Sequence, residues 1–364
     1  MSFYRDLVKD IGDENVHLLE DGENSAEFTG WIDTGSLMLN ALCSGSLYGG
    51  VPNNKILGLA GEEATGKTYF ALGMVEAFMK KAEDAGSIYY DTESAVTRDM
   101  MQNRGIDSKR LIVSEPSTVQ EFRYMALQAL KRYMDFKPKD RPPLMMILDS
   151  MGQLSTSKEM EDTESGSETK DMGRAALLKA TFRVLNLKLA KAKVPMIVTN
   201  HVYDKVGSFI PQKEMGGGSG LKYSASTILF LTKKKDRDGT DIAGNIITVT
   251  AQKSRFTKQY SKVQCKLSYE TGLNRYYGLL DLGVEYDILK KAAKGYEMPD
   301  GSKHGEKKIY ADPERFFTPD LMEKLEKAAN EKFMYGSVLG EAKSEDKMKD
   351  EGFESDNEEK GENT

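Results

Sequence analysis

Residues 61–68 read GEEATGKT and have the spacing of a phosphate-binding loop. The stretch fits the pattern G-x-x-x-x-G-K-[ST], in which the glycines let backbone N–H groups converge on phosphate oxygens. A short apolar stretch precedes it and a helical pattern opens at Gly66, and the N-terminus of such a helix favours anions. We therefore expect a P-loop that binds ATP through Gly61, Glu62, Glu63, Ala64, Thr65, Gly66, Lys67 and Thr68.

Three side chains could handle the charge of the bound triphosphate. We expect Lys67 to reach the β- and γ-phosphates and the hydroxyl of Thr68 to ligate Mg²⁺. Asp149 ends the apolar stretch LMMILD. A carboxylate in that place, on the P-loop side of a parallel sheet, suits an anchor for the metal and its water. The plainer alternative for Asp149 is a carboxylate that caps a turn.

Glu93 is the candidate for orienting the water that attacks the γ-phosphate. It lies in YYDTES, just past the end of another apolar stretch. A carboxylate at such a strand end can polarise water. The alternative is a solvated carboxylate in a loop.

His201 is one of three histidines, and it stands directly after the strand pattern MIVT and Asn200. A structural histidine held by a nearby carbonyl is the usual explanation for such a position. Three other strand ends carry Gly61, Glu93 and Asp149, so this strand end is expected beside the same phosphates. We predict that His201 contacts the γ-phosphate and links the nucleotide to the glycine-rich stretch that follows.

These residues require strands that end at one edge of a sheet and helices that begin there. Apolar stretches alternate with helical patterns along the chain, which is typical of an α/β fold with a mostly parallel sheet flanked by helices. The expected strands are 55–60, 87–91, 144–150, 196–199, 227–231, 245–252 and 262–269, and the expected helices are 66–82, 118–134 and 175–193. The last two strands are too close in sequence for a helical crossover, so that edge should be antiparallel.

Composition limits the class of protein. Of the 364 residues, 39% are hydrophobic and 30% are charged, which suits a folded core. The chain has no apolar stretch of membrane-spanning length and no signal-peptide pattern. Its two cysteines, Cys43 and Cys265, form neither a disulfide framework nor a metal-ligand spacing. We expect a reducing cytoplasm and no membrane partner.

The net charge of −6 would by itself argue against a nucleic-acid partner, but one segment carries it. Residues 341–364 hold ten acidic and four basic side chains, so the rest of the chain is balanced. The segment has almost no large apolar residues, and we expect a disordered acidic tail. Such a tail could aid solubility, or it could compete with a polyanion for a basic groove.

Five motifs occur in an order and at spacings typical of one family. They are DTGSLMLNALCSGSLYGGVPNNKILGLAGEEATGKT, YYDTESAV, LDSMGQLS, TNHVY and MGGGSGLKYSAS. The set resembles the RecA-type recombinases over roughly residues 30–285. It is most similar to the UvsX-type recombinases of T-even-like bacteriophages, which also have Asn-His in the fourth motif where the bacterial proteins have Asn-Gln. The resemblance implies a RecA-like P-loop ATPase core.

The resemblance also implies roles for single positions in the nucleotide site. Glu93 matches the catalytic glutamate of the family, and Asp149 and Ser150 match the end of its Walker B strand. His201 matches the residue that senses the γ-phosphate and passes its presence to a DNA-binding loop.

Two basic residues are implied to act between subunits. Lys253 and Arg255 match cations that reach the ATP of a neighbouring subunit, where they neutralise developing charge. Their i, i+2 spacing places both side chains on one side of a strand, provided that the strand continues through them. Met100 stands where bacterial members have an adenine-stacking tyrosine, and it is the expected but weaker contact to the base.

Two segments match the DNA-binding loops of the family, namely residues 152–172 and about 203–224. The first contains the acidic stretch 158–171, an unusual phosphate binder, and we expect no particular contact within it. The second contains four glycines within five positions. A flexible surface loop is one alternative. A dinucleotide-binding turn is disfavoured because no strand is expected to lead directly into the glycines.

The glycines of the second segment suit close approach to a sugar–phosphate backbone, because they lack Cβ atoms and expose N–H groups. A cation and an aromatic ring follow them and suit single-stranded DNA. The expected DNA contacts are Gly216, Gly217, Gly218, Ser219, Gly220, Lys222 and Tyr223.

We divide the chain into four parts. Residues 1–30 form an N-terminal arm that could make a polymerisation contact, and residues 31–276 form the ATPase core. Residues 277–335 form a small C-terminal domain, and residues 336–364 form the acidic tail.

The resemblance implies an ATP-dependent recombinase that requires ATP and Mg²⁺. Its partners would be single-stranded DNA, homologous double-stranded DNA, further copies of itself in a helical filament, a recombination mediator, a single-strand-binding protein and a helicase. For a phage protein the compartment would be the cytoplasm of the host bacterium. Two other classes stay open: a hexameric replicative helicase with the same fold, and a nucleotide-gated mediator protein. The intact Lys67, Thr68, Glu93 and Asp149 disfavour the mediator.

Overall fold

A computed structural model describes residues 3–13, 16–21, 27–166, 173–204 and 213–336. The helices are α1 (Phe3–Ile11), α2 (Leu37–Ser44), α3 (Lys67–Met79), α4 (Arg98–Asn103), α5 (Val119–Met134), α6 (Ser157–Glu164), α7 (Arg174–Ala192), α8 (Gly220–Ser224), α9 (Leu279–Glu285), α10 (Glu306–Ala311), α11 (Pro313–Phe316) and α12 (Pro319–Phe333). The strands are β1 (Trp31–Ile32), β2 (Val51–Pro52), β3 (Ile56–Gly61), β4 (Gly86–Asp91), β5 (Leu111–Ser114), β6 (Leu144–Asp149), β7 (Met196–Asp204), β8 (Lys213–Met215), β9 (Thr227–Asp238), β10 (Asp241–Ser254), β11 (Lys262–Ser268), β12 (Gly272–Leu273), β13 (Lys290–Ala292), β14 (Gly295–Glu297) and β15 (Lys303–His304).

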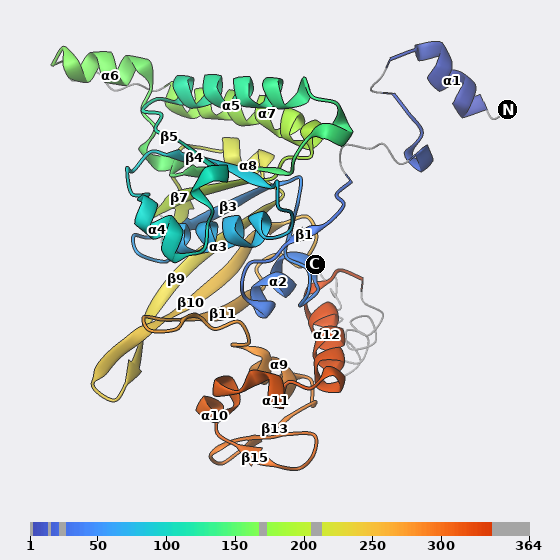
Figure 1. Ribbon diagram of the computed structural model, residues 1–364, viewed down its shortest axis with the longest axis vertical. Coiled ribbons are helices and arrows are strands. Elements are labelled where there is room, and N and C mark those ends of the chain that lie inside the picture. The colour runs from blue at the N-terminus through green and yellow to red at the C-terminus, as the bar shows by residue number, and fades with distance from the viewer. Residues whose placement is uncertain (1–2, 14–15, 22–26, 167–172, 205–212, 337–364) are drawn as a thin grey trace, which may run out of the picture.

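One large sheet organises the molecule (Figure 1). Its strand order is β12-β11-β10-β9-β3-β7-β6-β4-β5, and β8 pairs with the end of β7. The strands from β9 to β5 run parallel, whereas β10, β11, β12 and β8 are antiparallel to their neighbours. The predicted α/β fold with a mostly parallel sheet and one antiparallel edge is confirmed.

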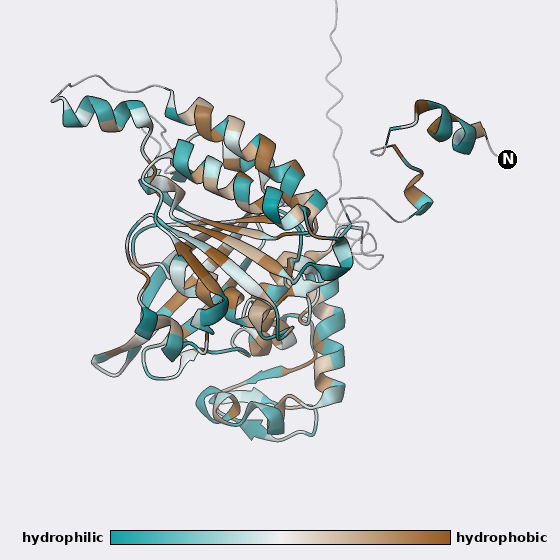
Figure 2. Ribbon diagram, turned by 45° about the horizontal axis from the view of Figure 1, so that its top comes forward, coloured by the Kyte–Doolittle hydropathy of each residue, from teal (hydrophilic) through white to brown (hydrophobic). Residues whose placement is uncertain are grey.

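Each face of the sheet has its own apolar layer, because successive strand residues point to opposite faces. On β4, Tyr89 packs into the layer of α2 and α3, while Ile88 and Tyr90 pack into the layer of α5 and α7. Figure 2 shows the hydrophobic strands lying between helices with hydrophilic outer surfaces. This two-sided burial explains why the central strands read as short, continuous apolar stretches.

The carboxyl ends of four parallel strands meet at one edge. Gly61 of β3 pairs with His201 of β7, and Asp91 of β4 pairs with Asp149 of β6. Glu93 follows β4 by two residues. The predicted convergence of these strand ends is therefore present.

Several elements differ from the expected ranges. The strands β9 and β10 extend far beyond the expected 227–231 and 245–252 and form a long hairpin. The edge strand β5, the helix α6 within the first acidic segment and the three-stranded sheet β13-β14-β15 had no counterpart in the prediction. The strand β8 leads directly into the glycine-rich stretch, contrary to expectation, but it is the antiparallel partner of β7 rather than the start of a dinucleotide-binding unit.

The two ends of the chain leave the sheet differently. Helix α1 stands away from the body in Figure 1 and buries none of its side chains. Helices α9 to α12 and the small sheet form a C-terminal lobe below the main sheet. Apolar side chains of this lobe, such as Leu289 and Phe333, belong to the same buried layer as α2 and α3. The predicted disordered tail lies outside the described residues, apart from Gly336, and the division into four parts stays a prediction.

Within the described part of the chain, none of the helices is both long and apolar enough to cross a membrane. The thiols of Cys43 and Cys265 are free and buried.

Candidate functional site

The P-loop joins β3 to α3, and its lysine is held by the loop itself. Lys67 Nζ donates to the carbonyl oxygens of Gly61 and Glu62 at 3.1 and 2.9 Å. Burial lowers the pKa of the Lys67 ammonium. A Cβ on Gly61 would lie 2.8 Å from the carbonyl oxygen of Leu231, so only glycine fits there. The loop thus holds a buried cation at the N-terminus of α3, where phosphate oxygens are favoured.

Asp149 is the centre of a hydroxyl cluster. Its Oδ2 accepts hydrogen bonds from Thr68 Oγ1 at 2.7 Å and from the hydroxyl of Tyr89 at 2.5 Å, and its Oδ1 accepts one from the hydroxyl of Thr199. Burial and the neighbouring Asp149 raise the pKa of Tyr89, so its hydroxyl stays a donor. The side chain of Asp149 is 4% exposed.

Thr68 and Asp149 form a donor set that fits Mg²⁺. A hydroxyl and a carboxylate in contact are the oxygen ligands that this ion takes beside substrate phosphates and water. Among the residues that the structure describes, no group of three His, Cys, Asp or Glu side chains could hold a metal by itself. This is consistent with a site completed by phosphate rather than a dedicated protein cage.

Glu93 is fixed at the same edge but stays accessible to water. Its Oε1 accepts a hydrogen bond from Ser150 Oγ at 2.7 Å, and its backbone N–H donates to Asp91 Oδ1 at 3.1 Å. The side chain of Glu93 is 32% exposed. Ser150, which the resemblance matched to the end of the Walker B strand, therefore orients the carboxylate of Glu93.

His201 lies beside Glu93 but not at the end of its strand. Its Nε2 is 3.3 Å from Glu93 Oε1. Strand β7 continues past His201 to Asp204, so the expected strand end at residue 199 is wrong. The extension has a physical cause, because β8 returns alongside and pairs with Val202, Tyr203 and Asp204.

Asn200 makes the contact that the sequence analysis missed. Its Nδ2 donates to the carbonyl oxygen of Gly216 at 2.9 Å, and its Oδ1 accepts from the backbone N–H of His201 at 2.9 Å. The backbone N–H of Gly216 in turn donates to the carbonyl oxygen of His201 at 3.2 Å. A polar residue inside a buried strand was the available signal, because a buried amide needs partners. The edge that carries Glu93 is thus bonded directly to the first predicted DNA-contact residue.

The glycines after Gly216 pack against the protein. A Cβ on Gly217 would lie 2.9 Å from Met151, and one on Gly218 would lie 2.9 Å from Ala175 of α7. A Cβ on Gly220 would lie 2.7 Å from the Cα atom of Lys179. Close packing on α7 and Met151 gives a separate reason for glycine at these positions, and their contact with DNA stays a prediction.

Lys222 and Tyr223 are exposed on α8, beside a groove of about 200 Å³. Other cations and apolar side chains line the groove, namely Lys213, Met215, Phe230 and Lys253. Lys179 Nζ lies 5.6 Å from the centre of the Tyr223 ring. Cations mixed with exposed rings are the features that bind single-stranded nucleic acid without reading sequence.

Three predicted residues lie away from the P-loop cluster. Met100, in α4, is half-buried against the apolar layer of α3. Lys253 pairs with Ile228 near the amino end of the parallel strands, opposite the edge where the P-loop follows β3. Strand β10 ends at Ser254 and has a bulge before Lys253, so the premise that the strand continues through Arg255 is wrong.

Comparison with known proteins decides the family. The sequence matches the family described as the RecA N-terminal domain over residues 4–274. The chain belongs to the RecA family. The matched region contains every predicted site residue, from Gly61 to Arg255.

Individual relatives agree with this assignment. A recombination and repair protein of Enterobacteria phage T4 is 30% identical over 262 residues, which cover 71% of this chain and 64% of that protein. The chain thus spans slightly less than two thirds of the phage relative's length. Protein RecA of a Nocardioides species is 29% identical over 312 residues, covering 85% of this chain and 84% of the relative. Protein RecA of Salinispora arenicola is 28% identical over 340 residues, covering 92% of each.

Two further lysines link this RecA-family P-loop to its surroundings, and the sequence analysis named neither. Lys233 of β9 donates to the carbonyl oxygens of Glu63 and Ala64 at 3.3 and 3.0 Å. Lys213 of β8 forms an ion pair with Glu62. The long hairpin and the strand before the glycines therefore both touch the loop.

Proposed function

We propose that this RecA-family chain is an ATP-dependent DNA recombinase that polymerises on single-stranded DNA and catalyses homologous pairing and strand exchange. The observation that carries the proposal is a pair of hydrogen bonds at Gly216: Asn200 Nδ2 donates to its carbonyl oxygen, and its backbone N–H donates to the carbonyl oxygen of His201. A recombinase must change its DNA affinity with its nucleotide state, and these bonds are a direct physical route for that change. The name of the phage T4 relative, a recombination and repair protein, supports a role in these processes.

In this proposal the phosphates of ATP bind over the N-terminus of α3. Lys67 exchanges its carbonyl partners on Gly61 and Glu62 for phosphate oxygens. Thr68 and Asp149 would hold Mg²⁺, which would supply positive charge beside the phosphates. The hydroxyl groups of Tyr89 and Thr199 keep the Asp149 carboxylate in place.

Glu93 orients the attacking water and accepts its proton. Its carboxylate suits this role because one oxygen is held by Ser150 Oγ while the side chain remains open to solvent. His201 stands beside the same oxygen, where it can contact a γ-phosphate. No covalent intermediate is needed, because positioning and electrostatic stabilisation account for this type of catalysis.

Single-stranded DNA binds at the groove beside α8. Lys213 and Lys222 supply phosphate contacts, and Tyr223 supplies a ring on which a base can stack. This assignment rests on the exposed side chains rather than on the packed glycines.

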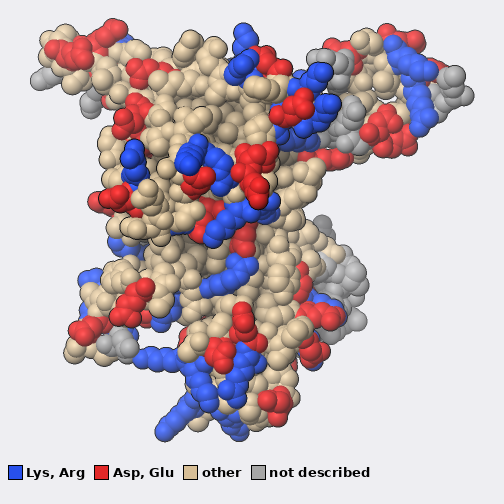
Figure 3. Space-filling view, viewed as in Figure 1, with Lys and Arg blue, Asp and Glu red and all other residues tan. Residues whose placement is uncertain are grey.

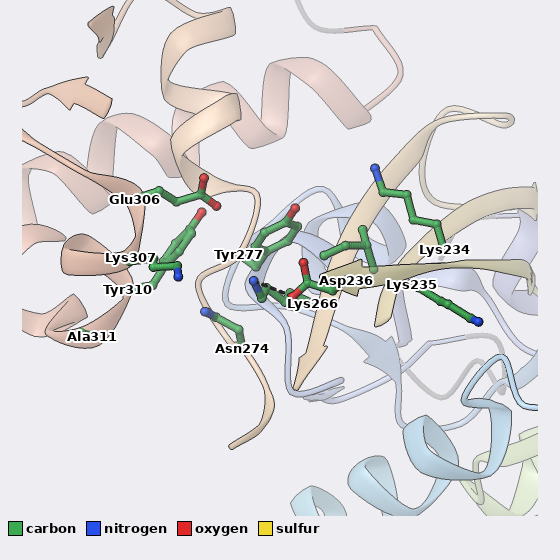
Figure 4. A pocket seen from close by; sticks show the side chains of 11 residues that line it. Lys234, Lys235, Asp236, Lys266, Asn274, Tyr277, Glu306, Lys307, Tyr310 and Ala311 are labelled. Atoms are coloured by element: carbon green, nitrogen blue, oxygen red, sulfur yellow. Dashed lines mark ion pairs between the residues drawn. The ribbon is translucent and has the colours of Figure 1, made fainter. Parts of the chain in front are cut away.

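Homologous double-stranded DNA binds at a second, basic cleft of about 670 Å³. The cleft lies between the β9–β10 hairpin and the C-terminal lobe, and Figure 4 shows Lys266 on the hairpin side and Tyr277, Tyr310 and Lys307 on the side of the lobe, while the Lys235 side chain points away. Lys266 is ion-paired to Asp236, and the side chains of Lys234, Lys235 and Lys307 are exposed. Figure 3 shows Lys and Arg side chains gathered over this lower part of the molecule. A surface of this kind binds phosphates independently of sequence.

Self-association into a filament involves the N-terminal arm. Phe3, Tyr4, Leu7 and Ile11 of α1 are 71, 66, 44 and 53% exposed, which gives the helix an uncovered apolar face. Burying one such side chain on a neighbouring subunit contributes roughly 1.5–3 kcal/mol. In cells, a filament of this kind would act with a mediator, a single-strand-binding protein and a helicase.

The test is ATP hydrolysis with and without single-stranded DNA, with Lys67→Ala as the inactive control. The proposal predicts strong stimulation by DNA, and an ATPase that DNA does not stimulate would contradict it. Electron microscopy distinguishes a recombinase from a replicative helicase, because a recombinase forms open helical filaments on DNA and the helicase forms closed six-membered rings.

A further inference from the structure

Glu62 of the P-loop is bonded through both its backbone and its side chain. Its carbonyl oxygen accepts hydrogen bonds from Lys67 Nζ and Thr65 Oγ1, each at 2.9 Å. Its carboxylate forms an ion pair with Lys213, the first residue of β8. One residue therefore contacts both the lysine proposed to bind the phosphates of ATP and the segment proposed to bind DNA.

The carboxylate of Glu62 is not needed for phosphate binding. The second position of the P-loop pattern is unrestricted, and backbone N–H groups of the loop surround the phosphates. A negative charge beside a site for anions opposes their binding. The ion pair with Lys213 offsets this charge and suggests a role for it outside the phosphate site.

The ion pair occupies a cation of the groove proposed for single-stranded DNA. Lys213 lines this groove, and β8 is a three-residue strand that pairs with the end of β7. A carboxylate in contact with an ammonium cancels much of its attraction for a DNA phosphate. The side chains of Lys213 and Glu62 are 34 and 58% exposed, and ion pairs as exposed as this one are weak. A modest change at Glu62 is therefore enough to release Lys213.

The nucleotide acts on Glu62 through the backbone of the loop. Lys67 Nζ binds the carbonyl oxygens of Gly61 and Glu62, and phosphate oxygens are stronger partners for an ammonium. Gly61 stays paired within the sheet, and Lys233 of β9 holds the next two carbonyl groups of the loop at 3.3 and 3.0 Å. Glu62 is thus the part of the loop whose bonding changes when Lys67 turns to phosphate.

We propose that Glu62 restrains Lys213 in the nucleotide-free protein and that ATP binding releases this lysine for a phosphate of single-stranded DNA. The contact is autoinhibitory, and it acts beside the hydrogen bonds at Gly216. The assignment of Lys213 to DNA rests on the proposed function. The ion pair and its loss on ATP binding do not, because they can be measured without DNA.

The first experiment is carbodiimide cross-linking of the full chain, which joins a carboxylate and an ammonium in contact as an amide. Mass spectrometry of the linked peptides should find Glu62 joined to Lys213 in the absence of nucleotide. A non-hydrolysable ATP analogue with Mg²⁺ should remove most of this product. The ion pair between Lys332 and Glu285 lies in the C-terminal part of the chain, and its product is the control that should stay unchanged. Absence of the Glu62–Lys213 product without nucleotide overturns the restraint, and an equal yield with the analogue overturns the release.

The second experiment measures the affinity for labelled oligo(dT) without nucleotide and with the analogue. Glu62→Gln should tighten nucleotide-free binding about threefold, as expected for loss of an exposed ion pair, and should leave binding with the analogue unchanged. Lys213→Gln should weaken binding with the analogue, and Glu62→Gln should have no effect in its background. The control Glu214→Gln removes an exposed carboxylate from the same groove and should change both affinities by the same factor.

Equal tightening by Glu62→Gln in both states, as in the control, would reduce Glu62 to a general effect of charge and overturn the proposal. A gain from Glu62→Gln that persists with Lys213→Gln would also overturn it. Failure of the unchanged protein to bind oligo(dT) would contradict the proposed function, while cross-linking would still decide whether ATP breaks the ion pair.

Discussion

At the scale of single residues, Asn200 joins two sites that are separate in the sequence. Its buried amide bonds to the backbone of His201 on one side and of Gly216 on the other. Any movement of His201 toward a phosphate must therefore act on the start of the glycine-rich segment.

We predict that Asn200→Ala uncouples DNA affinity from nucleotide state. The variant leaves the partly buried carbonyl of Gly216 without its side-chain partner, at a cost of about 1–3 kcal/mol. ATP affinity should stay near its original value, while the ATP-dependent gain in single-stranded DNA affinity should shrink about tenfold or more. Fluorescence anisotropy of a labelled nucleotide measures ATP affinity, and anisotropy of labelled single-stranded DNA, with ATP and with ADP, measures the gain in DNA affinity. Asn103→Ala, at an exposed amide, is the control. An unchanged difference between the two nucleotides would show that Asn200 is only structural.

We predict that Glu93→Gln binds ATP but hydrolyses it about 10²–10⁴-fold more slowly, because the amide cannot accept the proton of water. Hydrogen bonding to Ser150 is retained by the amide oxygen, so the local structure should persist. Equilibrium nucleotide binding and single-turnover hydrolysis give the two quantities, with the exposed Glu83→Gln as the control. Loss of ATP binding in Glu93→Gln would make its role structural.

The sequence predicted those site residues whose role depends on a strand end. Gly61, Glu93 and Asp149 follow apolar stretches, and parallel strands bring such ends together. Lys233 and Lys253 could not be understood in this way. Each contacts carbonyl oxygens of a distant segment, and backbone acceptors leave no pattern in the sequence.

At the scale of elements, the packing of α8 on α7 shapes the segment that we propose to bind DNA. The Cβ-free backbone at Gly218 and Gly220 lets the chain lie directly against Ala175 and Lys179. This packing holds the segment without help from DNA.

We predict opposite effects of alanine at two helical glycines. Gly220→Ala places a Cβ 2.7 Å from the Cα atom of Lys179 and should destabilise the fold by about 1–3 kcal/mol. Gly73→Ala in α3 meets nothing within 4 Å and should stabilise it by about 1 kcal/mol through helix propensity. Urea unfolding measures both free energies. Equal stability of the two variants would show that α8 does not pack closely on α7 at Gly220.

Long apolar elements were predictable, and polar or edge elements were not. Beyond Leu231 the β9–β10 hairpin reads TKKKDRDGTD, a composition typical of a loop, yet these residues pair as strands. Strands that face water carry polar side chains, so no apolar pattern marks them in the sequence. The strand β5 exposes Ile112 and Val113 at the sheet edge, and its four residues were too few to identify. The acidic helix α6 begins with a capping box between Thr156 and Glu159. This pattern is present in the sequence, but the prediction did not include a helix there.

At the scale of the whole molecule, the basic cleft between the hairpin and the C-terminal lobe should bind duplex DNA. Lys234→Ala combined with Lys307→Ala should weaken duplex binding and reduce the salt dependence of the affinity by about one unit of slope per lysine. Binding titrations at several salt concentrations give this slope. Lys131→Ala with Lys139→Ala removes the same charge from exposed positions on and after α5 and should have no effect. The same salt dependence of duplex affinity in both double variants would exclude the cleft as the duplex-binding site.

We predict that removing residues 1–21 abolishes filaments while the core stays folded. The truncation ends before Phe28, whose ring packs against Trp31 and Phe256. Helix α1 buries no side chain in its own subunit, so thermal unfolding should not change. Leu7→Glu with Ile11→Glu should reproduce the loss without shortening the chain. Filaments of normal length by electron microscopy would exclude the arm as a polymerisation contact.

Nucleotide binding at the sheet edge should drive the exchange of DNA strands. Strand exchange between a circular single strand and a homologous linear duplex tests it most directly, with ATP, with a non-hydrolysable analogue, and with Lys67→Ala. Joint molecules are expected with ATP and with the analogue, and none with Lys67→Ala or with non-homologous duplex. ATP-dependent unwinding without pairing, or no joint molecules at all, would contradict it.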